Sequence, residues 1–188
     1  MTAFGADGYR FVENFITMKR NVIIFGLVLG TILIGHSLYM VNTICNNPAY
    51  EGNDVVGYTA MVIVFSLAGV GIWNYRNKDL GGQISFGKAF KTGALIVLVA
   101  STVYVVVWLF YYYLVVPDFI DKYSEHVMLV AKKHGATEAE LAAKQESNEQ
   151  FAEMYKNPVF VVLISYMEVL PVGLLVALVS SLILKKKG

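Results

Sequence analysis

Four long apolar runs, separated by polar stretches, dominate the pattern of the chain. They cover about residues 21–41, 56–73, 93–116 and 159–184. An α-helix rises about 1.5 Å per residue, so roughly 20 apolar residues cross the ~30 Å hydrocarbon core of a bilayer. The pattern therefore predicts an all-α fold, an integral membrane four-helix bundle with these runs as its spans.

The polar stretch 117–158, between the third and fourth runs, carries its own helical signals. Asp118 is placed to cap a first helix, which we expect to end near His134. Thr137 and Glu140 have the three-residue spacing of a capping box and open a second helix. We expect an extramembrane helical hairpin here.

Residues 1–20 precede the first run and have no spanning potential of their own. Phe11, Val12, Phe15 and Ile16 stand at helical spacing, which leaves two readings open, an interfacial helix or an N-terminal tail. The first run is longer than the ~7–15-residue core of a cleavable signal peptide, and no Ala-x-Ala site follows it. We expect the first helix to be retained.

Basic residues indicate the orientation of the bundle. They stand beside the apolar runs in segments 19–20, 76–91 and 185–187, whereas the loop 42–55 has none. The stretch 117–158 is net acidic, with five Lys against eight Asp or Glu. The positive-inside rule then predicts a multi-pass protein with both termini in the cytoplasm and the 117–158 loop outside.

The composition agrees with a membrane protein and excludes several other classes. Hydrophobic residues make up 56% of the chain and charged residues 15%, against about 25% charged in soluble domains. A single cysteine, Cys45, leaves no intrachain disulfide and no thiolate cluster for a metal. The net charge of +1 argues against a nucleic-acid partner. We expect no cofactor and no metal. Membrane lipids are the expected partners, and a homo-oligomer or a membrane-protein partner is possible.

The strongest functional lead is Glu168, a carboxylate inside the fourth apolar run. Inserting an acidic residue at the centre of a span costs a free energy of about +2.5 to +3.5 kcal/mol. Such a residue is therefore expected to have a hydrogen-bond or charge partner or a functional role. Pro171 follows one turn later and frees the carbonyl of Met167. His36 lies at a similar predicted depth, and Tyr166 adds a hydroxyl. If His36 and Glu168 face each other, they would share a proton or form an ion pair.

Three roles for this candidate polar site stay open: hydrogen-bonding glue between helices, a proton or ion pathway, or a ligand site.

Small residues indicate where the helices touch. Gly26 and Gly30 in the first run, and Gly173, Ala177 and Ser181 in the fourth, recur at a spacing of four residues that allows backbones to approach.

A set of lysines flanks the spans at the predicted cytoplasmic face, and we expect it to anchor the bundle to anionic lipid headgroups. Its members are Lys88, Lys91, Lys185, Lys186 and Lys187.

Three segments, 84–93 (ISFGKAFKTG), 155–158 (YKNP) and 168–173 (EVLPVG), together resemble the bacterial membrane family of the domain of unknown function 4199. The resemblance covers about residues 18–187. It implies a small four-span protein of the bacterial inner membrane, without an assigned activity or catalytic residues. The family-motif positions that it singles out are Gly87, Lys88, Glu168 and Pro171.

No catalytic residues can be identified. The chain has no His-Glu-x-x-His and no Gly-x-Ser-x-Gly motif, so protease and lipase functions have no support. We expect a non-enzymatic integral membrane protein with a structural or accessory role in a membrane assembly. The alternative is a small proton- or ion-coupled transporter that uses Glu168 and His36.

Overall fold

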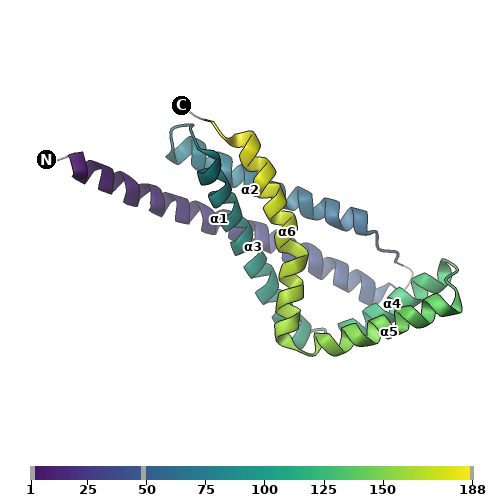
Figure 1. The fold of residues 1–188 in the computed structure, drawn as a ribbon. Helices are drawn as coiled ribbons and strands as arrows, with labels where there is room; N and C mark the ends of the chain where they lie inside the picture. Colours follow the sequence, from purple (N-terminus) through teal and green to yellow (C-terminus); the bar gives the residue numbers. More distant parts are fainter. Residues whose placement is uncertain (1–2, 48–49, 187–188) are drawn as a thin grey trace.

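The computed structural model of the chain describes the backbone of residues 3–47 and 50–186 and, within it, the side chains except those of residues 3–12 and 54. Over this part of the chain it contains one isolated β-bridge and six helices, which are α1 (Ala3–Asn46), α2 (Asp54–Asp79), α3 (Phe86–Leu114), α4 (Phe119–Lys133), α5 (Glu138–Tyr155) and α6 (Pro158–Leu184) (Figure 1). The long helices α1, α2, α3 and α6 are apolar enough to cross a membrane. The predicted all-α bundle, with a helical hairpin between its third and fourth long helices, is confirmed.

The first long helix begins earlier than its apolar run. From Ala3 on, the segment expected as a tail or interfacial helix is continuous with α1. Phe15 and Ile16 are exposed on it, whereas Phe11 and Val12 lie outside the described side chains. The position of this segment relative to lipid stays a prediction, as do the limits of the four spans.

The helix boundaries of the hairpin follow local signals with one exception. Gly135, with φ +78°, follows the end of α4, and Thr137 with Glu140 forms the predicted capping box of α5. Asp118 occupies the N-cap position of α4 but makes no capping hydrogen bond, so that prediction is wrong. Its backbone (φ −92°, ψ 9°) lacks the extended conformation of a capping residue, and its carboxylate pairs with Lys122 at 2.8 Å instead.

The two helices that carry the predicted small-residue pattern meet their neighbours through it. A Cβ on Gly30 of α1 would lie 2.7 Å from Val103 Cβ of α3. A Cβ on Gly173 of α6 would lie 2.5 Å from Val97 Cγ1 of α3. Distances this short mean that only glycine allows these helices to approach so closely.

Polar contacts fix the end of the bundle where both termini lie (Figure 1). The Asn21 side chain on α1 donates to the Gly71 carbonyl on α2 at 2.9 Å, and Asn74 donates to Asn21 at 2.8 Å. Arg76 Nη1 donates to the carbonyl of Leu184 at 3.0 Å, which connects α2 to the end of α6. We call this region, where the helices are close, the terminal end.

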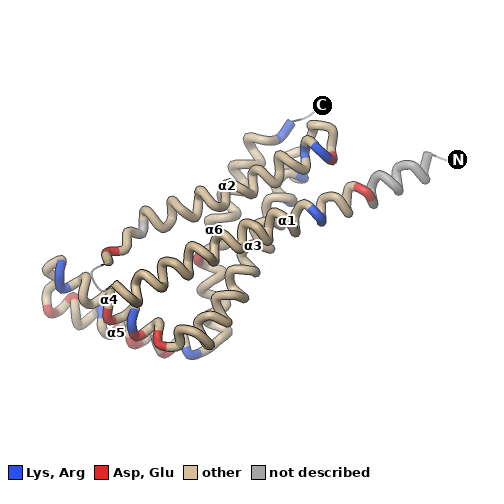
Figure 2. The backbone as a smooth tube through the Cα atoms, turned by 180° about the vertical axis from the view of Figure 1, so that it is seen from behind, with Lys and Arg blue, Asp and Glu red and all other residues tan. Residues whose placement is uncertain are grey.

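The helices separate toward the opposite end. Figures 1 and 2, seen from opposite sides, both show α1 and α2 diverging from α3 and α6, with the α4–α5 hairpin lying across the opening. The bundle is therefore closed at the terminal end and open at the hairpin end.

Gly173→Ala should destabilise the protein, because the added methyl would lie 2.5 Å from Val97 Cγ1 and 2.6 Å from Phe65 Cε1. Overpacking of this kind costs about 1–3 kcal/mol. The measurement is the midpoint of unfolding when sodium dodecyl sulfate is added to the protein in mild detergent. Gly35→Ala is the matched control, because a Cβ there meets nothing within 4 Å. Equal midpoints for the two variants would contradict the close contact of α6 with α3.

Candidate functional site

A cavity of about 600 Å³ lies where the helices diverge. Its lining comes from all six helices and consists of Ser37, Val41, Tyr58, Tyr104, Trp108, Phe119, Ile120, Tyr123, Phe151, Tyr155, Ile164, Ser165, Met167 and Glu168. We call it the hairpin cavity. Small-molecule sites in proteins have volumes of about 300–1,000 Å³, so the cavity has the size of such a site.

The hairpin cavity has an open side between α2 and α6. Tyr58 on α2 is 55% exposed and Met167 on α6 is 71% exposed, and both line the cavity. Both helices belong to the four that are long and apolar enough to span a bilayer. Tyr58 and Met167 therefore mark the side on which the cavity borders the surroundings of the bundle.

Glu168 lines the cavity and takes part in a polar chain across the bundle. Tyr104 on α3 donates its hydroxyl to Glu168 Oε2 at 3.3 Å, and Ser37 Oγ on α1 lies 3.5 Å from the same hydroxyl. A tyrosine hydroxyl has one proton, so Ser37 is the donor in the second contact. Helices α1, α3 and α6 are thereby joined through side chains that border the cavity.

The carboxylate keeps acceptor capacity beyond this one bond. A carboxylate offers about four acceptor positions. Within the described part of the chain, Glu168 receives only the hydrogen bond from Tyr104, and the residue is exposed and lines the cavity. The remaining positions of Glu168 are therefore available to a molecule inside the cavity.

Two of the predicted partners of Glu168 lie elsewhere. His36 is exposed and does not line the cavity, whereas its neighbour Ser37 does. The structure therefore does not bring His36 to Glu168. The hydroxyl of Tyr166 lies 2.9 Å from Thr102 Oγ1 on α3, so Tyr166 connects α6 to α3 and does not line the cavity.

Pro171 lies one turn beyond Glu168, and α6 continues through it as one helix. Because proline has no N–H, the carbonyl of Met167 loses its helical donor. Met167 lines the hairpin cavity. Pro171 thus leaves a backbone acceptor next to Glu168, as expected from the sequence.

Sequence reasoning missed Tyr104, Trp108 and Tyr155. Trp108 on α3 donates its indole N–H to the Tyr155 hydroxyl on α5 at 3.0 Å, which fixes the hairpin to the bundle. Burial raises the pKa of Tyr155 to about 12, so its hydroxyl is neutral at pH 7. The four-residue spacing of Tyr104 and Trp108 places them on one helix face, and this spacing could have indicated that both side chains meet the same site.

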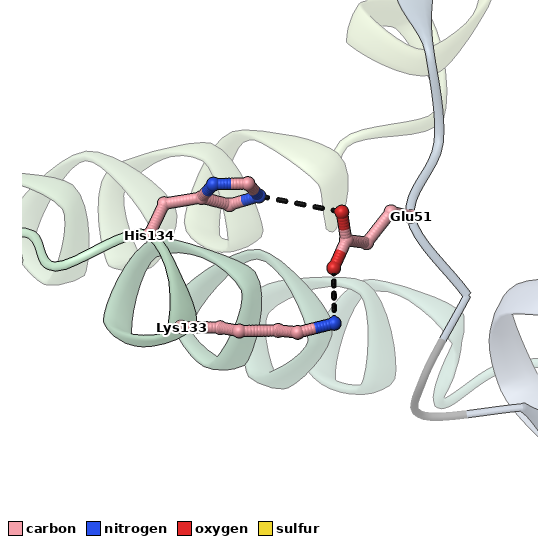
Figure 3. Close-up of polar contacts among 3 residues, drawn as sticks. All are labelled: Glu51, Lys133 and His134. Atoms are coloured by element: carbon pink, nitrogen blue, oxygen red, sulfur yellow. Dashed lines mark hydrogen bonds and ion pairs between the residues drawn. The ribbon is translucent and has the colours of Figure 1, made fainter.

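The far tip of the hairpin is held by an ion pair. Glu51, in the loop between α1 and α2, contacts Lys133 and lies 3.4 Å from His134 Nε2 at the end of α4 (Figure 3). The hydrogen bond from Lys133, together with its charge, lowers the pKa of Glu51. The hairpin is therefore connected to α3 at one end and to the α1–α2 loop at the other.

The predicted headgroup lysines are exposed at the terminal end, namely Lys88, Lys91, Lys185 and Lys186. Lys187 lies outside the described residues. The backbone of Lys186 pairs with Ile84 through two hydrogen bonds of 3.0 Å, which holds the end of the chain beside the α2–α3 loop. Contact of these lysines with lipid headgroups stays a prediction.

Larger than the hairpin cavity is a groove of about 650 Å³ on the hairpin itself, between α4 and α5. Its lining mixes the acids Asp121, Glu125 and Glu149 with Lys132, all exposed. Exposed charges of both signs are typical of a solvated surface. The hairpin cavity, which combines aromatic walls with an acid on a long apolar helix, is the better candidate site.

Comparison with known proteins identifies a family for this chain. The model of the family described as "Protein of unknown function (DUF4199)" matches residues 22–186. Residues 1–21 lie outside the matched range. No curated protein and no solved structure matches the chain.

Glu51→Gln should loosen the tip of the hairpin, because a neutral amide cannot form the ion pair with Lys133. We expect faster amide hydrogen exchange in the last turn of α4 at pH 7. Glu146→Gln on α5 is the matched control, since Glu146 is exposed and, in the described part of the chain, accepts a hydrogen bond from Gln150 of its own helix.

The effect of Glu51 should also depend on pH. Because the pKa of Glu51 is lowered in the folded protein, its contribution is complete above its ordinary pKa and is lost as the pH falls through the lower, folded value. The difference between wild type and Glu51→Gln, corrected for intrinsic exchange rates, should disappear in acid. Equal exchange at pH 7 would show that the ion pair does not hold the hairpin.

Proposed function

The chain belongs to the DUF4199 family, whose function is unknown, and we propose that it is a non-enzymatic binding protein of the membrane. Its hairpin cavity would take a small amphipathic molecule from the lipid phase. The observation that supports this proposal is the position of Glu168, whose free acceptor positions border a cavity of about 600 Å³ lined by all six helices.

The lining has the composition of a small-molecule site, in which apolar walls surround the ligand and a few polar groups orient it. Seven of the fourteen lining residues are aromatic. The polar groups of Ser37, Tyr104 and Glu168 lie together on one side, because they form one chain of contacts. A ligand would direct its polar end toward Glu168 and its apolar body toward the rings.

The lining gives no support to catalysis. Ser165 Oγ donates to the Val161 carbonyl at 2.7 Å, so this hydroxyl is already engaged. Among the described lining residues there is no His or Lys to activate a serine as a nucleophile. Nor does the described part of the chain hold three His, Cys, Asp or Glu side chains placed to bind a metal ion.

A structural or accessory role in a membrane assembly is the second candidate. It is favoured by the contacts Ser37–Tyr104–Glu168, which join three helices and give Glu168 the role of glue. An accessory protein of this kind would co-purify with a partner protein and carry no small molecule.

Proton- or ion-coupled transport is the third candidate. It is favoured by the asymmetry of the bundle, because a titratable acid borders a cavity where the helices diverge, whereas glycine contacts bring the helices close beyond it. A carrier alternates between a state in which its site is accessible from one side of the membrane and a state in which it is accessible from the other. Since His36 does not line the cavity, a carrier would depend on Glu168 without His36.

We place the protein in the bacterial inner (cytoplasmic) membrane with both termini in the cytoplasm and the hairpin outside. The distribution of charge supports this placement, because the terminal end has basic residues beside each long helix and the middle of the bundle is almost free of them (Figure 2). The acidic excess of 117–158 supports the same orientation.

Cysteine labelling in intact cells tests this orientation. In a Cys45→Ser background, Ser147→Cys on α5 should react with a membrane-impermeant maleimide, because Ser147 is exposed on the hairpin. Gln83→Cys, exposed in the α2–α3 loop, should react only after the cells are permeabilised. The reverse pattern would overturn the proposed orientation.

Filling the hairpin cavity tests the binding function. Ser37→Phe adds a ring to the cavity lining and should remove most of the small molecule that co-purifies from native membranes, measured as adducts by native mass spectrometry. Thr31→Phe is the matched control, because Thr31 is exposed on the same helix outside the lining. A wild-type protein without adducts, or adducts that survive Ser37→Phe, would contradict the proposal.

A further inference from the structure

The geometry points to a lipophilic organic cation as the ligand of the hairpin cavity. This inference rests on the proposed binding function and names the class of molecule that the cavity takes. Three observations carry it: the charge of the lining, the aromatic character of the walls, and the shape and open side of the cavity.

The lining holds one acid and no base. Among the described residues that border the cavity, Glu168 is the only charged side chain, and no Lys, Arg or His accompanies it. An ionised carboxylate in low-dielectric surroundings is stable only with a counter-charge or several donors, and Tyr104 supplies a single hydrogen bond of 3.3 Å. A cationic ligand would supply the missing counter-charge.

The aromatic walls favour the same sign of charge. The face of an aromatic ring is electron-rich and attracts a cation placed within about 6 Å of its centre. Seven aromatic side chains line the cavity, and one of them, Trp108, is of the ring type that attracts cations most strongly. An anionic ligand would meet both the ring faces and Glu168 with unfavourable electrostatics.

The donor set favours an organic cation over a metal ion. Mg²⁺ and Ca²⁺ take about six to eight oxygen ligands. The cavity offers one carboxylate surrounded mainly by rings, which suits an ammonium or phosphonium group with apolar substituents. Its open side, marked by the exposed side chains of Tyr58 and Met167, faces the lipid from which such a molecule partitions.

Two phenyl-substituted ions of nearly the same shape and opposite charge test the inference. Tetraphenylphosphonium is the cationic probe, and tetraphenylborate is its anionic counterpart. The chain has two tryptophans, so Trp73→Phe leaves Trp108 in the cavity lining as the fluorescent reporter. The protein is titrated in phosphatidylcholine nanodiscs, and titrations of nanodiscs without reporter protein correct for partitioning into lipid.

We expect tetraphenylphosphonium to quench Trp108 saturably and tetraphenylborate not to. Glu168→Gln should weaken tetraphenylphosphonium binding by on the order of tenfold or more, because the counter-charge is lost while the amide oxygen still accepts from Tyr104. Glu153→Gln is the matched control, since Glu153 is an exposed acid of α5 outside the cavity, and it should leave binding unchanged.

Saturable binding of tetraphenylborate as tight as that of the phosphonium, or unchanged phosphonium binding in Glu168→Gln, would overturn the cationic class and leave the binding function standing. Failure of both ions and of neutral tetraphenylmethane to bind would count against the binding function as well. If Glu168→Gln does not fold, the comparison of the two ions on the Trp73→Phe protein decides the matter.

Discussion

The structure depends on how a carboxylate is accommodated inside an apolar helix. Glu168 cannot be surrounded by hydrocarbon without a large cost, so the helices around it must supply hydrogen-bond donors or space. The bundle supplies some of each: Tyr104 gives one donor across the α3–α6 contact, and the cavity gives the rest of the carboxylate room. The position of this acid on α6 thus coincides with the point where the helices stop packing tightly.

Side-chain size explains why the bundle opens at one end. In the middle of the bundle, between the hairpin cavity and the terminal end, Gly30 and Gly173 bring α1 and α6 close to α3. At the hairpin end, Trp108 and Tyr112 on α3 pack against Tyr155 of the hairpin, with a distance of 5.0 Å between the ring centres of Tyr112 and Tyr155. Large rings fill the widening interhelical space only in part, and the hairpin cavity is what remains.

Features set by local sequence were predicted correctly from the residues. The capping box at Thr137 and the end of α4 near His134 depend only on neighbours a few positions away, so local sequence reveals them. The four apolar helices follow from run length in the same way. The failure at Asp118 is also local in cause, because Lys122, one turn later, competes for its carboxylate.

The composition of the candidate site could be predicted only in part. Glu168 stood out as a carboxylate inside an apolar run. Its depth relative to His36 follows from counting residues along the two helices. Rotation about the helix axis does not, and one residue turns a side chain by about 100°. That rotation places Ser37 at the cavity and leaves His36 outside it, and in the same way it directs Tyr166 to Thr102. Tyr104 became visible as a partner only when α3 and α6 were placed side by side.

The proposed structural and binding roles of Glu168 are compatible, because they would use different parts of the carboxylate. The bond from Tyr104 occupies one acceptor position and fixes α6 against α3, whereas the positions that face the cavity take no part in holding the helices. Transport would need more than this. The glycine contacts between the hairpin cavity and the terminal end would have to separate, and the bond of Asn21 to the Gly71 carbonyl would have to break at the terminal end. A molecule that binds Glu168 from the lipid side requires none of these changes, and for this reason the geometry favours binding over passage through the bundle.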